Sequence, residues 1–303
     1  MQQLQDTLCD AFEKVDGTAR FREDPWQRPG GGGGRTRVLA EGTVFEKAGV
    51  NWSEVHGEMN EALAGEVPGE GRDFHATGVS MVLHTRNPMV PAFHANIRMI
   101  SKGDARWVGG GADMTPYYPR EEDAVHFHST WKKVCEPFDS AWHPRFKSWC
   151  DEYFYLPHRN EMRGIGGIFF DYVGLSSDVL PARAIKNSPR ALEEAVPIQT
   201  AWEFIQSVGN HLLTSYVPVI ERRMGESWTE EERQFQLVRR GRYAEFNLLY
   251  DRGTQFGLRT NGRTESILMS MPPLARWDYD AVPPAGSREA ILLDFLKPRD
   301  WVS

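Results

Sequence analysis

Residues 93–99 read Phe-His-Ala-Asn-Ile-Arg-Met, with apolar and polar side chains alternating without a break. Because successive side chains of a β-strand point to opposite faces, His94, Asn96 and Arg98 share one face and the apolar residues pack behind it. We expect further strands on either side of this one, within residues 78–85 and 107–115. The segment therefore predicts a sheet with an imidazole, an amide and a guanidinium on one side.

Polar groups of the two flanking strands extend this face. In the preceding strand Ser80 and His84 share a face, and in the following one a run of three glycines precedes Asp113. The glycines permit close approach of a backbone or a ligand. Spacing alone leaves a merely polar, half-solvated sheet face as an alternative, but such a face usually carries Lys, Glu and Thr. The mixture His-x-Asn-x-Arg favours a functional site.

The bulk properties of the chain exclude several classes of protein. A chain of 303 residues with 40% hydrophobic side chains and no linker predicts a single domain over residues 1–303. The net charge of −7 without a basic run argues against nucleic-acid binding. Three dispersed cysteines argue against a zinc ribbon or a disulfide framework. No signal-peptide pattern or apolar run of membrane-spanning length occurs, so we expect a cytoplasmic protein.

The remaining segments predict an α+β fold, in which helices flank an antiparallel sheet. Apolar periodicity and caps predict helices over 2–15, 119–135, 142–153 and 202–219, and two more that begin at Thr229 and Ser287. Further strands are predicted over 168–172, 242–250, 256–259 and 264–271. The last two would be joined by a hairpin at residues 260–263, since Asn261-Gly262 is the typical pair of a type I′ turn.

Two glycine-rich stretches raise the question of a cofactor. Five consecutive glycines, Gly30 to Gly34, are flanked by arginines but lack the Gly-Lys-Ser/Thr of a phosphate-binding P-loop. They indicate either a flexible loop or an anion-binding lid. Glycines 164–167 do not form a dinucleotide fingerprint. The sequence therefore predicts no organic cofactor.

Six segments in the same order resemble the oxygen-dependent coproporphyrinogen-III oxidases, and the resemblance runs from near Asp6 to Trp301. The segments are GVSMVLHTRNP, HANIR, WVGGGADMTPYY, YFYLPHRNEMRGIGGIFFD, RRGRYAEFNLLYDRGTQFGL and NGRTESILMSMPP. The resemblance implies oxidative decarboxylation of two propionates of coproporphyrinogen III to vinyl groups, with dioxygen as oxidant, in haem biosynthesis. It also implies a large antiparallel sheet with helices on both sides, and a homodimer with contacts near residues 243–278.

The same resemblance implies roles for individual residues. His94 corresponds to the proton donor, and imidazole changes charge near neutral pH. Asp113 is a candidate anchor or base for the pyrrole N–H groups. Guanidinium is the best partner for the four substrate carboxylates in an acidic protein. The substrate-binding positions implied are Ser80, Asn96, Ile97, Arg98, Asn261, Gly262 and Arg263.

A metal ion is the point that the sequence leaves open. In some bacterial members of the family the residues matching His84, His94, His128 and His158 are described as ligands of a divalent ion, whereas other members are regarded as metal-free. Four imidazoles suit a transition metal. Two other functions remain as alternatives to coproporphyrinogen oxidation. One is a mononuclear-metal oxygenase acting on another carboxylic acid, and the other is a tetrapyrrole carrier without turnover.

Overall fold

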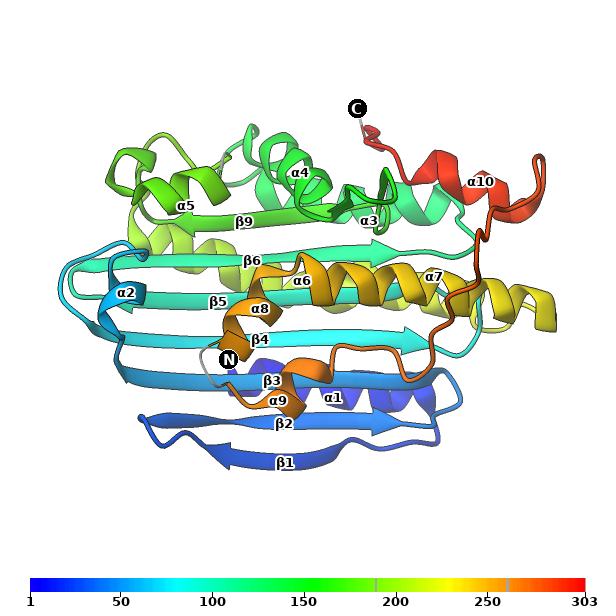
Figure 1. Cartoon of the computed structure of the whole chain (residues 1–303), viewed down its shortest axis with the longest axis horizontal. Helices are drawn as coiled ribbons and strands as arrows, with labels where there is room; N and C mark the ends of the chain where they lie inside the picture. Colours follow the sequence, from blue (N-terminus) through cyan, green and yellow to red (C-terminus); the bar gives the residue numbers. More distant parts are fainter. Residues whose placement is uncertain (189, 260–261, 303) are drawn as a thin grey trace.

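A computed structural model describes residues 1–188, 190–259 and 262–302, and an antiparallel sheet organises them (Figure 1). Its seven strands lie in the order β1-β2-β3-β4-β5-β6-β9. They are β1 (Arg22–Gln27), β2 (Gly32–Ala40), β3 (Phe45–Glu58), β4 (Asp73–Thr85), β5 (Ala92–Lys102), β6 (Ala105–Thr115) and β9 (Gly167–Val173). The short strands β7 (Tyr155–Leu156) and β8 (Glu161–Met162) pair separately.

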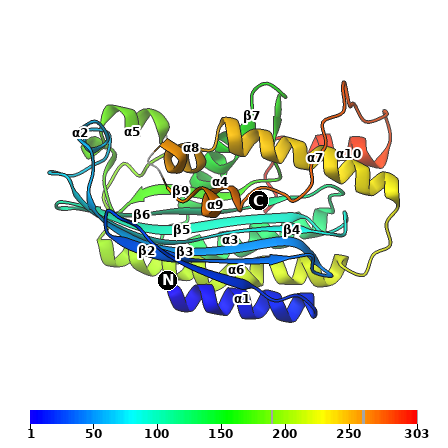
Figure 2. The ribbon, with the colours of Figure 1, turned by 60° about the horizontal axis from the view of Figure 1, so that its bottom comes forward.

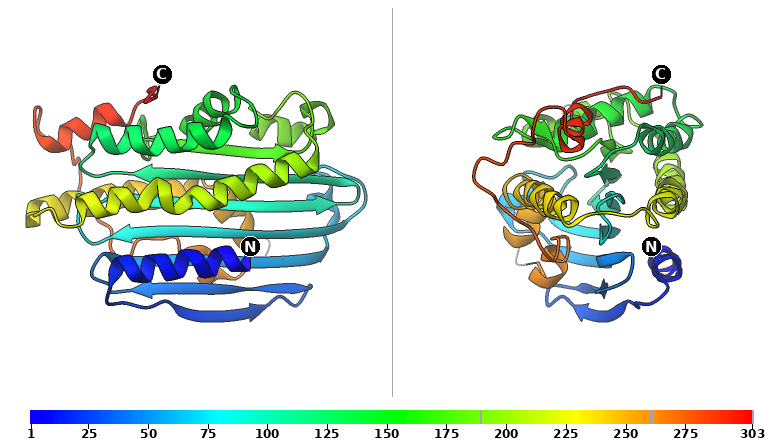
Figure 3. Two further views of the ribbon diagram at one scale, coloured as in Figure 1. Left: turned by 180° about the vertical axis from the view of Figure 1, so that it is seen from behind. Right: turned by 90° about the vertical axis from the view of Figure 1, so that its right-hand side faces the viewer.

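Helices cover both faces of the sheet, which confirms the predicted α+β class. Behind the sheet in the view of Figure 1 lie α1 (Gln2–Asp16), α3 (Glu121–Cys135) and α6 (Ile198–Arg223), and Figure 3 shows this side. The opposite face carries α7 (Glu230–Leu249), α8 (Arg252–Arg259) and α9 (Thr264–Leu268) (Figure 2). The other helices are α2 (Glu61–Ala64), α4 (Trp142–Tyr153), α5 (Ala182–Asn187), α10 (Arg288–Phe295) and the 3-10 turn Ser177–Val179. No described helix is long and apolar enough to cross a membrane.

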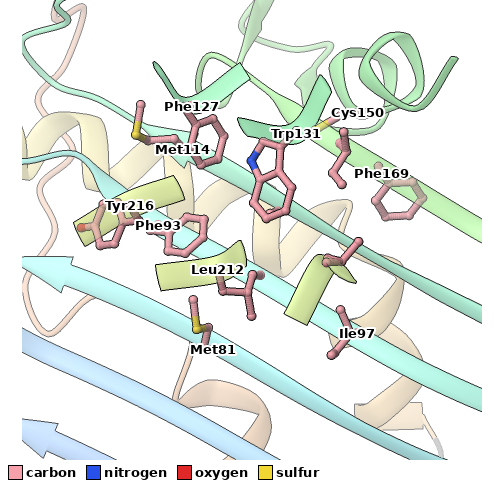
Figure 4. Packing of buried hydrophobic residues seen from close by; sticks show 14 of the residues in the cluster. Met81, Phe93, Ile97, Met114, Phe127, Trp131, Cys150, Phe169, Leu212 and Tyr216 are labelled. Atoms are coloured by element: carbon pink, nitrogen blue, oxygen red, sulfur yellow. The ribbon is translucent and has the colours of Figure 1, made fainter. Parts of the chain in front are cut away.

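The hydrophobic core lies between the sheet and α3 and α6 (Figure 4). Phe93 stacks on Tyr216 of α6 at a ring-centroid distance of 4.6 Å and meets Phe127 of α3 edge-on at 5.8 Å. Ile97, further along the same face of β5, is 3% exposed. Burial of each such side chain stabilises the fold by about 1.5–3 kcal/mol. The apolar half of the alternation in β5 is thus committed to this core, and the polar half must face the other side.

The strand predicted over residues 242–250 is wrong, because residues 242–249 form the second half of α7 and Tyr250 caps it. The N-cap of this helix is Thr229, whose side chain and that of Glu232 form a capping box. Its buried residues recur at helical spacing, as at Arg239, Tyr243 and Phe246. Apolar residues alternate along the end of this helix, whereas much of its buried face consists of Arg, Gln and Glu side chains, which an apolar pattern does not reveal.

The hairpin predicted at residues 260–263 is also wrong, since its flanking segments are the helices α8 and α9. The predicted turn residues 260 and 261 lie outside the described residues. Gly262 donates its N–H to the carbonyl of Gly257 over 2.8 Å. A Cβ at Gly257 would lie 2.8 Å from Ile267, so the absence of a side chain allows the two helices to approach. An Asn-Gly pair favours a local turn but does not determine what flanks it.

The glycine run at residues 30–34 is not a flexible loop, because Gly32 to Gly34 belong to β2. A Cβ at Gly33 would lie 2.3 Å from the carbonyl of Trp26, and one at Gly34 would lie 2.4 Å from the indole of Trp26. Arg35, which follows, hydrogen-bonds Gln5 of α1 over 2.7 Å and so faces away from His94. The glycines therefore serve the close packing of β1 against β2, and the flanking Arg35 does not close over the predicted site.

Candidate active site

A row of small and polar side chains crosses the sheet on the face opposite the core. Directly paired residues of antiparallel strands point to the same face. From β1 to β6 the register aligns Asp24, Thr36, Asn51, Ser80, Asn96 and Gly111. The structure thus places Ser80 directly opposite Asn96. Helix α9 packs on the part of the row nearer β1, where Asn51 of β3 donates to the Ser266 carbonyl over 2.8 Å.

The predicted acid–base residues lie beside this row and contact each other. The register pairs His94 with Asp113, and Nδ1 of His94 lies 2.7 Å from Oδ1 of Asp113. The other carboxylate oxygen accepts from Arg163 over 2.6 Å. Burial would raise the pKa of Asp113, but the Arg163 guanidinium and the His94 hydrogen bond hold it below its ordinary value. An ionised Asp113 can only accept, so Nδ1 of His94 carries the proton in this pair.

Arg163, which sequence reasoning missed, is fixed by an aromatic cage. Its guanidinium carbon lies 4.1 Å from the ring centroid of Phe154, 4.4 Å from that of Tyr243 and 4.9 Å from that of Phe246. It also donates to Asn247 of α7 over 2.7 Å. Both Arg163 and Asp113 have side chains only 2% exposed. This buried ion pair joins the sheet, the β8–β9 connection and α7 behind His94.

Arg98 lies on the same face with its guanidinium held from two sides. It donates to Asn96 over 2.9 Å and to Asp171 of β9 over 2.8 Å. To reach β9 it passes over Gly109 of β6, where a Cβ would lie 2.9 Å from Nη2 of Arg98 and 2.4 Å from Asp171. The glycine run was expected to allow a backbone or a ligand to approach the sheet closely. At Gly109 the groups that approach are instead the side chains of Arg98 and Asp171. Asp171 was not predicted, because no local pattern shows that β9 pairs with β6.

Arg263 lies at the other end of the row. Its Nη2 is 2.5 Å from Asp24 of β1, and its Nη1 is 3.2 Å from Oγ of Ser266. Gly262 precedes it and is exposed. Of the other predicted substrate positions, Asn261 lies outside the described residues, and the side chain of Ile97 points into the core on the opposite face. The structure therefore brings Ser80, Asn96, Arg98 and Arg263 to one face and leaves the Ile97 side chain out.

Asp251, another acidic residue near the row, was not predicted from the sequence either. Tyr153 of α4 donates its hydroxyl to Asp251 over 2.9 Å. The guanidinium of Arg252 lies 4.7 Å from the centroid of the Tyr153 ring and 5.6 Å from that of Phe169. Phe169 continues the row, since it pairs with Gly111. Burial, and then the charge of Asp251, raise the pKa of the Tyr153 hydroxyl, so it remains a donor at neutral pH.

The structure separates two of the four histidines that were expected to bind a metal. His84 contacts the Ser270 carbonyl over 2.9 Å on the α7–α9 side, whereas His128 contacts the Ile165 carbonyl over 3.1 Å from α3, on the core side. Burial and then the charge of Arg240 lower the pKa of His84 well below its ordinary value. Burial lowers that of His128 to about 3. Both imidazoles are therefore neutral, and each has one nitrogen without a partner among the described residues.

The other expected ligands are engaged elsewhere. His158 uses both nitrogens, at 2.9 Å from the Tyr250 hydroxyl and 2.7 Å from Glu245, and His94 is bound to Asp113. In the part of the chain that the structure describes, no group of three or more His, Cys, Asp or Glu is placed to hold a metal ion. The four imidazoles thus do not fit a single ion in this arrangement, and no chemical step is assigned to one.

The fold and the site together define an α+β protein whose sheet presents an acid–base pair and two guanidinium groups on one face, an arrangement suited to a small polycarboxylate. The chain belongs to the coproporphyrinogen III oxidase family, whose model matches residues 1–301. It is 52% identical to the oxygen-dependent coproporphyrinogen-III oxidase of Prochlorococcus marinus strain MIT 9313, over 98% of this chain and 88% of the relative. The oxidase of strain NATL1A of the same species is 50% identical, over 99% of this chain and 88% of the relative.

Proposed function

We propose that this chain catalyses the oxygen-dependent oxidative decarboxylation of coproporphyrinogen III to protoporphyrinogen IX, a step of haem biosynthesis. The relatives with this name align with nearly the whole chain. The structural observation that carries the proposal is that the His94–Asp113 pair and the guanidinium of Arg98 lie on one sheet face, separated from the core.

The chemistry of each step defines what the site must supply. In each reacting propionate a C–H bond next to the pyrrole ring and the C–C bond to the carboxylate both break. A C=C bond forms and carbon dioxide leaves. The hydrogen of the broken C–H bond and its two bonding electrons reduce dioxygen to hydrogen peroxide. Charge balance then requires one proton for each propionate. A positioned imidazole is the side chain best suited to deliver a proton near neutral pH.

We assign the delivery of that proton to His94. Asp113 fixes Nδ1–H of His94, so Nε2 is the nitrogen that serves the substrate. Both oxygens of Asp113 are bonded, one to His94 and the other to Arg163. We therefore assign Asp113 the role of orienting His94, rather than that of a base for the pyrrole N–H groups.

Dioxygen dependence tests the proposed reaction. Coproporphyrinogen III is expected to be converted in air without any added organic cofactor, and conversion is expected to stop when dioxygen is removed. Porphyrin fluorescence after oxidation of the product measures the yield. Undiminished anaerobic turnover would refute the proposal. Binding of the tetrapyrrole without turnover would support a carrier, and loss of activity on chelation would support the metal-oxygenase alternative.

Arg98→Ala is expected to weaken substrate capture. A lost charge-assisted hydrogen bond costs about 1.5–3 kcal/mol, which corresponds to about 10- to 150-fold in affinity. The effect should appear in kcat/KM, measured by steady-state kinetics. Arg222→Ala is the matched control, because Arg222 pairs with Asp123 on α3, away from the site. A change of kcat/KM in Arg98→Ala no larger than in this control would remove Arg98 from the propionate site.

We also propose a homodimer, on the basis of an exposed apolar surface close to the region that the resemblance implicates. Exposed apolar side chains occur on the end of α7, on α8 and on the segment that follows α9. They are Leu248, Leu249, Phe256, Leu258, Leu274, Trp277, Tyr279 and Val282. Apolar patches of this kind mark interaction surfaces.

Sedimentation equilibrium should give twice the mass of the chain, and Leu249→Lys should reduce the measured mass to that of a monomer. A monomeric wild type at micromolar concentration would refute the dimer.

A further inference from the structure

The guanidinium of Arg263 is paired with a carboxylate of the protein itself, that of Asp24. A carboxylate of the substrate is expected to bind at this same position. Asp24 of β1 begins the row across the sheet, two strands away from Asn51, and its Oδ2 accepts from Nη2 of Arg263 over 2.5 Å. An aspartate side chain and a propionate present the same carboxylate to a guanidinium. The contact between Asp24 and Arg263 is therefore chemically equivalent to the contact that a propionate would make.

We propose that Asp24 occupies the carboxylate-binding position of Arg263 in the free protein and is displaced when a carboxylate of the substrate binds. Asp24 then competes with the substrate and sets the affinity of the site for carboxylate-bearing ligands. This inference rests on the proposed function, in which Arg263 holds a propionate.

The environment of the pair makes displacement easy. The side chains of Arg263 and Asp24 are 28% and 41% exposed, and exposed ion pairs contribute little to stability. Asp24 belongs to the edge strand β1, which pairs only with β2 in the sheet order. Among the contacts of the described residues, its carboxylate bonds only to Arg263. When the Asp24 side chain turns away, no other hydrogen bond recorded among the described residues is broken.

The rest of Arg263 is held independently of Asp24. Its Nη1 lies 3.2 Å from Ser266 and 3.5 Å from Thr36, whose hydroxyls are themselves 2.6 Å apart. Displacement of Asp24 therefore frees Nη2 while Nη1 stays on the sheet. The guanidinium remains in position for an incoming carboxylate, so little ordering is required at binding.

The other guanidinium of the site shows the contrast. Asp171, the partner of Arg98, is more buried than Asp24, at 13% exposed, and its second oxygen also accepts from the backbone N–H of Tyr172 over 3.0 Å. Asp171 is thus tied to its own strand and orients Arg98 permanently. The two arginines have different partners, one fixed and one replaceable, and only the Asp24 contact behaves as a competitor.

Asp24→Asn tests this competition. The probe is coproporphyrin III, the oxidised and unreactive form of the substrate with four propionates, titrated by fluorescence. We expect its Kd to fall about 2- to 5-fold, the range of an exposed ion pair. KM for coproporphyrinogen III should fall by a similar factor with little change in kcat. In an Arg263→Ala background the same substitution should have no effect, because the competing contact no longer exists.

Glu23→Gln is the matched control, since Glu23 is the neighbouring acid on β1 but bonds Arg37 over 2.8 Å on the opposite face. Its Kd should match that of the wild type. A Kd for Asp24→Asn that is unchanged or higher, in a protein with the wild-type melting temperature, would overturn the inference. If that variant is unstable, Asp24→Ser is subject to the same criterion. If Asp24→Asn binds the probe more tightly but neither the wild type nor any variant turns over coproporphyrinogen III, only the proposed function is refuted. If the proteins turn over normally but Asp24→Asn binds the probe as the wild type does, only the role of Asp24 is refuted.

Discussion

Replacement of His94 by alanine is expected to lower kcat about 10²- to 10⁴-fold, the contribution of a positioned acid or base. His94 is the imidazole of the site face that a buried carboxylate orients. In the proposed mechanism the proton from His94 is needed only as dioxygen is reduced. In the proposed binding mode the substrate carboxylates contact guanidinium groups elsewhere on the face, so KM should change much less than kcat. Steady-state kinetics under air saturation would separate the two constants.

His126→Ala is the control for this experiment. His126 is on α3 and contacts the Thr214 carbonyl over 3.0 Å, on the core side of the sheet. It makes no hydrogen bond with any described residue of the site. Its kcat should remain at the wild-type level. An intact kcat in His94→Ala would overturn the catalytic assignment. A large rise in KM with unchanged kcat would instead make His94 a substrate-binding residue.

The centre of the sheet was predictable from sequence because two independent signals agree there. The period-two pattern of residues 93–99 assigns the faces of β5, and short connections leave an antiparallel partner on each side. Ser80, His94, Asn96 and Arg98 consequently lie on the face where they were expected. Helices with a cap or a stop signal were equally predictable from sequence. Gly17, which follows α1, has a φ of 79°, in the left-handed region that glycine adopts most readily.

The residues that complete the site were missed because their partners are distant in sequence. Arg163 meets Asp113 across 50 residues, Asp171 meets Arg98 across 73, and Asp24 meets Arg263 across 239. No local period encodes such contacts, since they depend on which strands pair and on how the segments after α7 return to the sheet. The error in residues 242–250 had another cause, because a window of nine residues was too short to distinguish a helix from a strand.

Replacement of Arg163 by methionine is expected to destabilise the fold by about 3–5 kcal/mol, the cost of leaving one member of a buried ion pair without its partner. Methionine retains the apolar contact with Phe154 but removes the charge that compensates Asp113. Arg222→Met, at a pair whose arginine is 39% exposed, should cost less than about 1 kcal/mol. Urea denaturation of the three proteins measures both values.

The pH dependence of that loss distinguishes an uncompensated charge from a packing defect. In the wild type the pKa of Asp113 lies below its ordinary value, so its stabilising contribution is present at neutral pH and is lost only as the pH falls through the lowered pKa. Without Arg163, burial dominates and the pKa of Asp113 should rise above ~3.9, the value of an exposed Asp. Folding then favours the protonated acid, and the penalty grows as the pH rises. The free-energy difference between the wild type and Arg163→Met should therefore be larger at pH ~7.5 than at pH ~4. An equal difference at both values would mean that Arg163 acts through its contacts with the surrounding rings and not through its charge.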